Sequence, residues 1–405
     1  MSDFLVRRVA EGEQRATLTV LSQALHGGAI SDERWEMMSA AFPADRKFAA
    51  FDGDEPIGIA SSFATETRVP GGQVLPTAAV DGIGVRADWT RRGVLTAMMA
   101  RQLPDFAERG EVLASLHASE TTIYGRFGYG AAAYGKTVRL VKPGARWRPE
   151  APVSGHVRLL SPADAVELIP RLYERIGLRR AGMIARPARW WTDRHINRVN
   201  DPKGLRVAVH SGPDGDDGYV AFTVIPLTTF DDPERGAAID VKDLHAASPE
   251  TRAALWRFLL GMDLVSEIRA RALPVDETIE ELLVDSRACH VIGLGDDLWL
   301  RLVDVEAALS ARTYLDAEPV VLDVVDRRLP GNTGHYAVGP GGAKRTDAAA
   351  GARLDVETLA MLYLGEWKAS TLVRAGRITV TDPSVAASLD ELFRTPDKPW
   401  CGTNF

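Results

Sequence analysis

The chain has 405 residues, of which 48 are Lys or Arg and 55 are Asp or Glu, so the formal net charge is −7. Hydrophobic residues make up 45% and charged residues 25%, which is ordinary for a globular protein. These values exclude intrinsic disorder, a collagen-like repeat and a coiled coil for the whole chain, and the length predicts two or three domains. Mild acidity argues against general nucleic-acid binding and is compatible with a cationic small substrate.

No sequence feature indicates export, membrane insertion or metal binding. The first residues lack the apolar core of a signal peptide, and no run approaches 18 apolar residues. Cys289 and Cys401 have neither disulfide-framework nor metal-ligand spacing, and the eight histidines are scattered. We therefore expect a cytoplasmic protein without a metal cofactor or a membrane-inserted segment.

The first 146 residues have the pattern of an α/β domain. Pro104 is expected to kink or interrupt the helix in which it lies. The expected elements are helices at 16–26 and 31–40, a hairpin around Asp52-Gly53-Asp54, a strand at 74–85, a helix within 91–110, a strand at 111–118, and a short helix running into the Gly-rich turn of 120–130.

Residues 147–292 repeat this order, with a hairpin at 205–226, a strand at 236–246 and a helix that opens at Ser248. Aligning Leu244 with Val85 without gaps places Arg252 at the position of Gly93 and Glu250 at the position of Arg91. We interpret this as a tandem duplication whose second copy lacks the turn chemistry of the first; the alternative is chance similarity of two ordinary α/β units. Residues 293–405, which mix strands with helices, are expected to form a third domain.

The segment with the clearest chemical meaning is VDGIGVRADWTRRGVLTAMM, at residues 80–99. A strand there leads into a turn with two arginines and a glycine, and the turn opens a helix. The first N–H groups of a helix lack intrahelical partners and its dipole end is positive, so a pyrophosphate fits there. Gly93 would let a phosphate approach the backbone while Arg91 and Arg92 add charge. A plain helix start with solvated arginines is the alternative.

In this segment the chain resembles the GNAT acetyltransferases, although Thr90 and Leu95 depart from that family's general loop pattern. The run RRGVL followed by Met98-Met99 is similar to one branch, the Eis (enhanced intracellular survival) type of N-acetyltransferase. The run SETTIYGRFGYG at 119–130 and the ending WCGTNF strengthen the resemblance.

The resemblance implies an α/β (α+β) fold with two GNAT-like domains followed by a sterol-carrier-protein-like domain. The boundaries expected are 1–146 for an acetyl-CoA-binding domain, 147–292 for a degenerate copy, and 293–405 for the last domain. It also implies a homohexamer, a trimer of dimers, that acetylates amines of cationic substrates such as aminoglycosides, polyamines or lysine-like groups.

The resemblance also implies roles for particular residues. Tyr124 would act as general acid, and the terminal carboxylate of Phe405 would act as general base. The backbone around Ile83–Val85 would polarise the thioester carbonyl. The residues expected to hold acetyl-CoA are Ile83, Gly84 and Val85 for the acetyl and pantetheine arm, Arg91, Arg92, Gly93, Val94, Leu95 and Thr96 for the pyrophosphate, and Ser119 and Glu120 at its border.

Each of these assignments has a simpler alternative. Tyr124 would otherwise be a core tyrosine, Glu120 a solvated carboxylate, and the chain end frayed and inert. Trp190 and Trp191, which stand beside arginines, are expected to form a core or interdomain pair rather than a base-stacking surface. Two rival functions stay open: a lipid-binding protein with a decayed acyltransferase site, and a transferase that uses a longer acyl-CoA.

Overall fold

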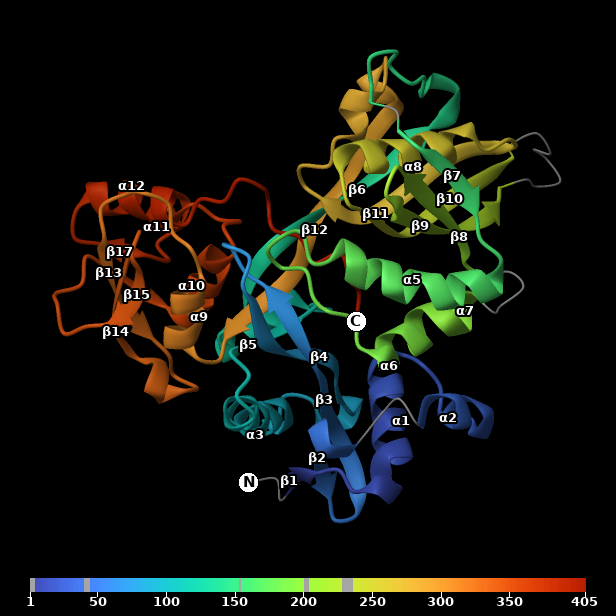
Figure 1. The fold of residues 1–405 in the computed structure, drawn as a ribbon. Coiled ribbons are helices and arrows are strands. Elements are labelled where there is room, and N and C mark those ends of the chain that lie inside the picture. Colours follow the sequence, from blue (N-terminus) through green and yellow to red (C-terminus); the bar gives the residue numbers. More distant parts are fainter. Residues whose placement is uncertain (1–3, 40–43, 153, 200–203, 228–235) are drawn as a thin grey trace. The chain divides into compact units, whose positions relative to one another are not determined.

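The computed structural model describes residues 4–39, 44–152, 154–199, 204–227 and 236–405 (Figure 1). They fall into two compact units, which we describe separately. Unit 1 comprises residues 1–132, 298–396 and 405, and unit 2 comprises residues 133–297 and 397–404.

The first part of unit 1 is a sheet with the strand order β1-β2-β3-β4-β5-β12. All neighbours are antiparallel except β4 and β5, which run parallel. The expected hairpin around Asp52-Gly53-Asp54 is confirmed as the β2–β3 turn. The strands are β1 (Leu5–Arg8), β2 (Lys47–Asp52), β3 (Glu55–Arg68), β4 (Val74–Val85), β5 (Leu113–Leu116) and residues 298–302 of β12 (Cys289–Leu302).

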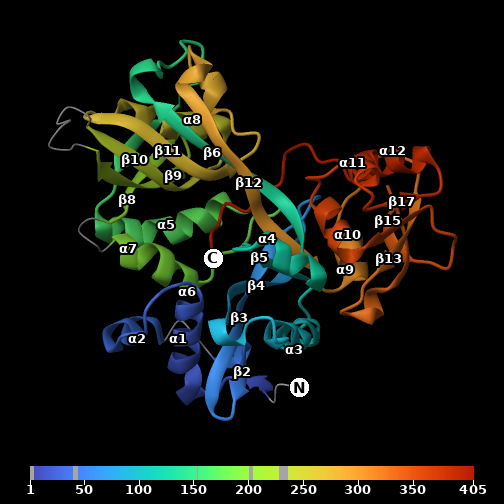
Figure 2. The same cartoon turned by 180° about the vertical axis from the view of Figure 1, so that it is seen from behind.

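Helices cover both faces of this sheet, as the two opposite views show (Figures 1 and 2). Gly82 and Gly84 of β4 face α1 (Gln14–Ala24), where a Cβ on either glycine would lie within about 3.1 Å of that helix. Alternate residues of the same strand, Ile83 and Val85, pack instead with the core formed by α3 (Val94–Glu108). A third helix, α2 (Asp32–Ser39), follows α1 along the chain.

Pro104 lies inside α3, which continues to Glu108, so the interruption expected as one outcome is wrong and the kink expected as the other stays a prediction. Proline removes one backbone hydrogen bond from the helix. The flanking side chains of Leu103 and Phe106 are both buried, and burying two such side chains contributes about 3–6 kcal/mol. That burial outweighs the lost hydrogen bond.

The second part of unit 1 is a five-stranded sheet with the order β15-β14-β13-β16-β17. Its central strand, β13, pairs antiparallel with β14 and parallel with β16. The strands are β13 (Val320–Val325), β14 (Gly334–Gly339), β15 (Gly342–Arg345), β16 (Ala352–Asp355) and β17 (Thr379–Val380), and the helices are α9 (Val305–Ala311), α10 (Val356–Tyr363), α11 (Ala369–Arg374) and α12 (Pro383–Leu392).

The glycines of the GRFGYG run allow α10 to approach that run closely. A Cβ at Gly130 would lie 2.3 Å from the carbonyl oxygen of Glu357, and one at Gly128 would lie 2.8 Å from both Arg301 and Val356. Gly128 also has φ +85°, which a side chain rarely adopts. The two parts of unit 1 therefore meet at the segment that carries Tyr124.

In unit 2 the sheet strands follow the order β6-β11-β10-β9-β8-β7. Its only parallel pair among the described strands is β10 with β11. Its elements are β6 (Gly130–Val141, of which residues 133–141 belong to this unit), β7 (His156–Leu159), α5 (Pro162–Ile176), α6 (Ala188–Trp191), α7 (Asn197–Val199), β8 (Arg206–Gly212), β9 (Gly215–Pro226), β10 (Ala237–Ala246), α8 (Pro249–Gly261) and β11 (Val265–Pro274).

The two faces of this sheet bury different helices. Residues of β8 and β9 alternate between a core built with α8 around Trp256 and a core built with α5 around Tyr173. Trp191 is buried in the α5 core, and Trp190 packs edge-to-face on it with ring centroids 4.9 Å apart. The prediction that these tryptophans form a core pair is confirmed.

The ungapped alignment of the two copies fails after the strand. In the first copy residues 86–93 separate β4 from α3, whereas only Ala247 and Ser248 separate β10 from α8. Glu250 and Arg252 therefore lie within α8 and do not occupy the places of Arg91 and Gly93.

One buried ion pair of unit 1 makes a testable prediction about stability. Arg301 donates to Asp326 at 2.6 Å, and neither side chain is more than 1% exposed. The carboxylate also accepts from the Asn332 side-chain amide. Removing one partner leaves the other charge buried and unpaired, so we expect Asp326→Asn to lower the free energy of unfolding by about 3–5 kcal/mol in urea denaturation.

The matched control is Glu391→Gln, which breaks the pair between Glu391 and Arg394, both more than half exposed. It should cost less than about 1 kcal/mol. Equal effects of the two variants would contradict the role assigned to the buried pair.

Candidate active site

The candidate site lies where β4 separates from β5. The parallel pairing of these described strands runs from Thr77–Leu113 to Ala79–Ser115, although β4 continues to Val85. Immediately after Ala79, the register between β3 and β4 shifts, and two residues of β4 stand opposite one of β3. Such a bulge bends its strand. The Ser61 hydroxyl holds it by donating to the Asp81 carboxylate at 2.6 Å.

The predicted residues Ile83, Gly84 and Val85 form the end of β4 beyond this bulge. They pair with β3 on one side, and no pairing with β5 continues along this part of the described strand. Because backbone groups of a strand point alternately to its two sides, some of the N–H and C=O groups here face away from β3. They are suited to hydrogen-bonding an extended, amide-containing ligand.

The turn at Arg91–Gly93 opens α3 with an unusual backbone. Arg91 has φ +61° and Gly93, the N-cap residue, has φ +87°. A left-handed arginine costs about 1–2 kcal/mol, a strain that concentrates at functional sites. All three residues of the turn are exposed, and the Arg92 guanidinium lies over the Trp89 ring at 5.0 Å.

Among the described residues, no side chain caps the N-terminus of α3, and no atom lies within 4 Å of where a Cβ on Gly93 would project. The first N–H groups of the helix, on Val94, Leu95 and Thr96, are therefore offered to an anion. The second copy differs, because the Ser248 hydroxyl accepts a hydrogen bond from the Thr251 N–H at 3.1 Å. The residues predicted to bind pyrophosphate fit that ligand chemically.

Tyr124 is the last residue of the short helix α4 (Thr121–Tyr124) and is buried. Its ring packs edge-to-face on Tyr129 with centroids 6.2 Å apart. Burial, and to a smaller extent the charge of Glu120, raises the pKa of the Tyr124 hydroxyl above its ordinary value of 10.0. The hydroxyl therefore keeps its proton through neutral pH. Ser119 and Glu120, which precede the helix, are exposed.

Phe405 is a docked residue of unit 1, with 9% of its surface exposed. Its ring lies edge-on to Phe63 at 5.6 Å and to His117 at 4.7 Å. Phe63 pairs with Ala79, the last β4 residue paired to β5, and His117 stands two residues after Ser115, the last β5 residue of that pairing. The ring thus lies next to the point where the two strands separate, and the expected docked chain end is confirmed.

Sequence reasoning missed the residues that receive Phe405 and the bulge that opens the strand pair. Phe63 lies in the part of β3 at residues 57–65, which is buried apart from Ala64. An aromatic residue in a buried strand is not by itself a sign of function. His117 stands two residues before the quoted SETTIYGRFGYG run, and its position just beyond a strand was the one available hint.

Other kinds of site have no support in the described residues. Within them, no group of three His, Cys, Asp or Glu side chains is arranged to hold a metal ion. Among the helices that the structure describes, none has the length and apolarity needed to span a bilayer. Cys289 and Cys401 are both buried and free.

Comparison with family models divides the chain into three domains. Residues 5–132 and residues 182–302 each match an acetyltransferase (GNAT) domain, and residues 305–402 match a sterol carrier protein domain. The predicted α/β fold with two GNAT-like domains and a sterol-carrier-like domain is confirmed.

Individual relatives agree with this division. The chain is 35% identical over 412 residues to an uncharacterized N-acetyltransferase of Streptomyces avermitilis, covering 99% of both chains. It is 34% identical over 353 residues to the N-acetyltransferase Eis of Mycobacterium tuberculosis, covering 84% of both. The crystal structure of Eis1 from Mycobacterium abscessus superposes with a TM-score of 0.88 at 38% identity, covering all of both chains. The chain is therefore an acetyltransferase that belongs to the Eis-type GNAT N-acetyltransferase family.

Proposed function

We propose that this enzyme transfers the acetyl group of acetyl-CoA to an amine of a cationic small molecule, such as an aminoglycoside, a polyamine or a lysine-like group. Ile83–Val85 would hold the acetyl and pantetheine arm, Arg91–Thr96 the pyrophosphate, and Ser119-Glu120 the border of the cofactor. The net charge of −7 favours attraction of a cation. A homohexamer, a cytoplasmic location and the boundaries 1–146, 147–292 and 293–405 stay predictions.

The observation that carries this proposal is the uncapped start of α3, eight residues beyond the end of β4. A glycine with open space above it stands at the N-cap, and two arginines precede it. This combination provides backbone donors, positive charge and room for a diphosphate next to a strand end that can bind the amides of pantetheine.

The reaction needs a base and an acid. An amine with a lysine-like pKa of about 10.4 is protonated at neutral pH and must lose a proton before it attacks the thioester. The terminal carboxylate of Phe405, with an ordinary pKa of about 3.5, accepts that proton directly or through water where desolvation raises its basicity. The nitrogen then forms its bond to the carbonyl carbon while N–H groups near Ile83–Val85 stabilise the oxyanion. Breakage of the carbon–sulfur bond releases a thiolate, which takes the Tyr124 proton, and the second proton that the nitrogen loses as the amide forms returns to the Tyr124 oxygen.

A thiol-release assay separates this function from its two rivals. Release of coenzyme A from acetyl-CoA with a panel of polyamines and aminoglycosides supports the proposal. A strong preference for a longer acyl-CoA would favour the transferase that uses longer acyl groups. Lipid binding without thiol release would favour the lipid-binding protein with a decayed acyltransferase site.

Tyr124→Phe removes only the hydroxyl, so we expect kcat to fall about 100-fold or more with little change in the affinity for acetyl-CoA. Because the pKa of Tyr124 is raised above 10.0, the wild type should lose activity through this group only above pH 10, and the variant should lack that alkaline limb. Stopped-assay pH profiles measure both effects.

The matched control for this variant is Tyr129→Phe, five residues later on the ring that packs against Tyr124. Within the part of the chain that the structure describes, its hydroxyl is buried without a hydrogen-bond partner, so its removal should leave turnover near wild type. Wild-type turnover in the Tyr124 variant would refute the acid role.

Extending the chain by two glycines after Phe405 should abolish acetyl transfer, because the free carboxylate moves by about 7 Å and a peptide bond takes its place. The same two residues added before Met1 should leave the rate unchanged. Equal rates for the two extended proteins would rule out the terminal carboxylate as base.

Gly93→Ala tests the phosphate turn. A Cβ there would project into the open space above the start of α3, so we expect the Kd for acetyl-CoA in calorimetry to rise about fivefold or more, equivalent to about 1 kcal/mol. Gly110→Ala is the matched control, because Gly110 has a similar φ of +76° and equally open surroundings. Both variants should lose similar stability, and a control with equally weakened binding would contradict the assignment.

A further inference from the structure

The parallel strand pair of unit 2 also separates partway along. Pairing between β10 and β11 runs from Ala237–Val265 to Val241–Ala270, and the register of β10 with β9 shifts at Lys242, directly after Val241. On the other strand, Ala272 adopts φ +49° at a further register shift against β6. As in unit 1, a bulge coincides with the end of parallel pairing.

In unit 2 this opening is filled by residues 397–404, which we call the tail. The Trp400 indole donates to the Ala272 carbonyl at 2.7 Å, and so reaches β11 beyond the last paired residue. The Gly402 carbonyl lies 3.3 Å from Nε2 of His245, which is on β10 beyond its bulge. The tail therefore contacts both diverging strands.

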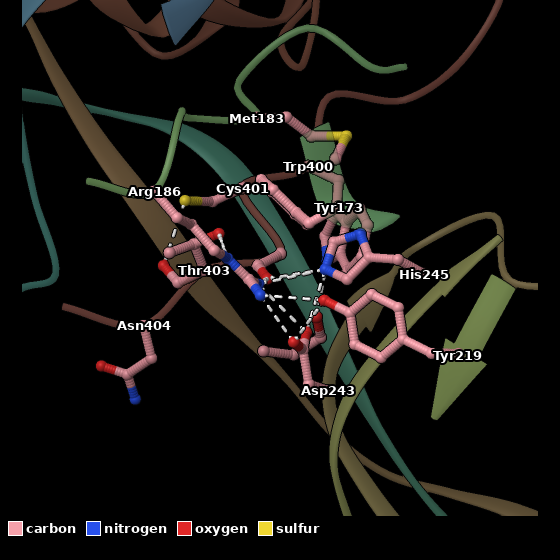
Figure 3. Close-up of polar contacts among 12 residues, drawn as sticks. Tyr173, Met183, Arg186, Tyr219, Asp243, His245, Trp400, Cys401, Thr403 and Asn404 are labelled. Atoms are coloured by element: carbon pink, nitrogen blue, oxygen red, sulfur yellow. Dashed lines mark hydrogen bonds and ion pairs between the residues drawn. The ribbon is translucent and has the colours of Figure 1, made fainter. Parts of the chain in front are cut away.

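Arg186 is the centre of the contacts that hold the tail (Figure 3). Its Nε donates to the Thr403 hydroxyl at 3.0 Å, and its Nη2 donates to the Gly402 carbonyl at 2.7 Å. On its other side, Nη1 and Nη2 bind the Asp243 carboxylate at 2.6 and 3.0 Å. Nη1 also reaches the Tyr219 hydroxyl at 3.0 Å, so each of the five N–H groups of the guanidinium has an oxygen acceptor.

The surroundings fix this guanidinium in one orientation. Its side chain is 1% exposed, and its carbon lies 4.2 Å from the ring centroid of Tyr173 and 4.1 Å from that of Trp190. Attraction to Arg186 and His245 holds the pKa of the Asp243 carboxyl well below its usual range despite burial, so the pair is ionised. A buried charge with every donor used permits little freedom to the groups it binds.

Two further contacts restrict the last tail residues. The Trp190 indole donates to the Asn404 carbonyl at 2.9 Å. Gly402 has φ +63°, and a Cβ there would lie 2.6 Å from the Trp400 ring, so the tail folds back over its own tryptophan. Phe405 follows Asn404 by one peptide bond.

We propose that Arg186, held by Asp243, is a positioning residue for acetyl transfer, because it fixes the tail and thereby the residue that follows it, Phe405. This inference rests on the proposed function, in which the carboxylate of Phe405 is the base. A displacement of about 1 Å at a reacting group can cost 100-fold in rate.

The test uses the full-length protein and two readouts. The first is the rate at which a carboxypeptidase releases Phe405 below the unfolding temperature, which reports how often the tail opens. The second is the kinetics of acetyl transfer, with kcat separated from the KM for acetyl-CoA. The variants are Arg186→Lys, which keeps the charge but lacks the five-donor fork, and the milder Trp190→Phe, which keeps an aromatic ring but removes the indole N–H to Asn404 and guards against misfolding of the first.

The control is Arg171→Lys, on α5 of the same unit, where Arg171 makes an exposed pair with Glu167. We expect Arg186→Lys to speed the release of Phe405 roughly tenfold or more and to lower kcat roughly 10- to 100-fold with KM for acetyl-CoA nearly unchanged. Trp190→Phe should speed release roughly fivefold, the equivalent of one neutral hydrogen bond, and the control should change neither quantity.

Unchanged release in both variants would overturn the claim that these contacts hold the tail. Faster release with unchanged kcat would overturn the positioning role. The role of the Phe405 carboxylate as base is tested by a different experiment, and a full rate in the protein extended after Phe405 would refute it. Because the release assay needs no acetyl transfer, its result stands whatever the substrate proves to be.

Discussion

The interruption of parallel strand pairing by a bulge is the constraint on which both GNAT-like copies depend. In unit 1 the bulge follows Ala79 and in unit 2 it follows Val241, in each case at the last residue paired with the parallel neighbour. An extra residue bends one strand away from the other and leaves backbone groups without a strand partner. Unpaired backbone in a protein interior must be satisfied by something else, so each opening requires an occupant.

The two copies meet this requirement in different ways. The first keeps an eight-residue connection, a left-handed arginine and an uncapped helix start, which together suit a phosphorylated ligand. The second has a two-residue connection and a helix start capped by Ser248, and its opening receives the tail. Because that opening is filled by the chain itself, the second copy has no need of an arginine-rich turn.

Local signals in the sequence predicted the elements well but did not predict what opens and fills the strand pairs. Two apolar runs around a Gly/Asp turn located β2 and β3, a β-rich run located β4, and the glycine after two arginines located the start of α3. A bulge adds one residue to a strand and so shifts its alternation of side chains by one position, but it leaves no reliable trace in composition. Asp81 and Lys242, which lie at the two bulges, therefore could not be identified from the sequence. The ungapped comparison of the copies failed for a related reason, because the two copies differ in the length of the connection between strand and helix.

The other features that could not be predicted depend on contacts between residues far apart in the sequence. Gly128 and Gly130 carry part of the family resemblance. The structure explains why they are glycines, because α10, more than two hundred residues later, leaves no space for a side chain at either position. Similarly, Arg186 was one of several arginines in a tryptophan-containing segment, and nothing local connects it with Asp243 or with Gly402. Sequence separations of 57 and 216 residues place such partnerships beyond any periodicity.

The chemistry of the Arg186–Asp243 pair indicates what it is for. Replacing a buried ion pair by well-packed apolar side chains is often neutral or stabilising, so stability alone is a weak reason to bury one. An apolar replacement, however, could not donate to the Thr403 hydroxyl and the Gly402 carbonyl at two fixed angles from one rigid plane. Asp243 neutralises the charge on one edge of the guanidinium and leaves its other edge free to bind the tail. The pair therefore gives the chain end a defined position, which is the property that the base proposed on the last residue would require.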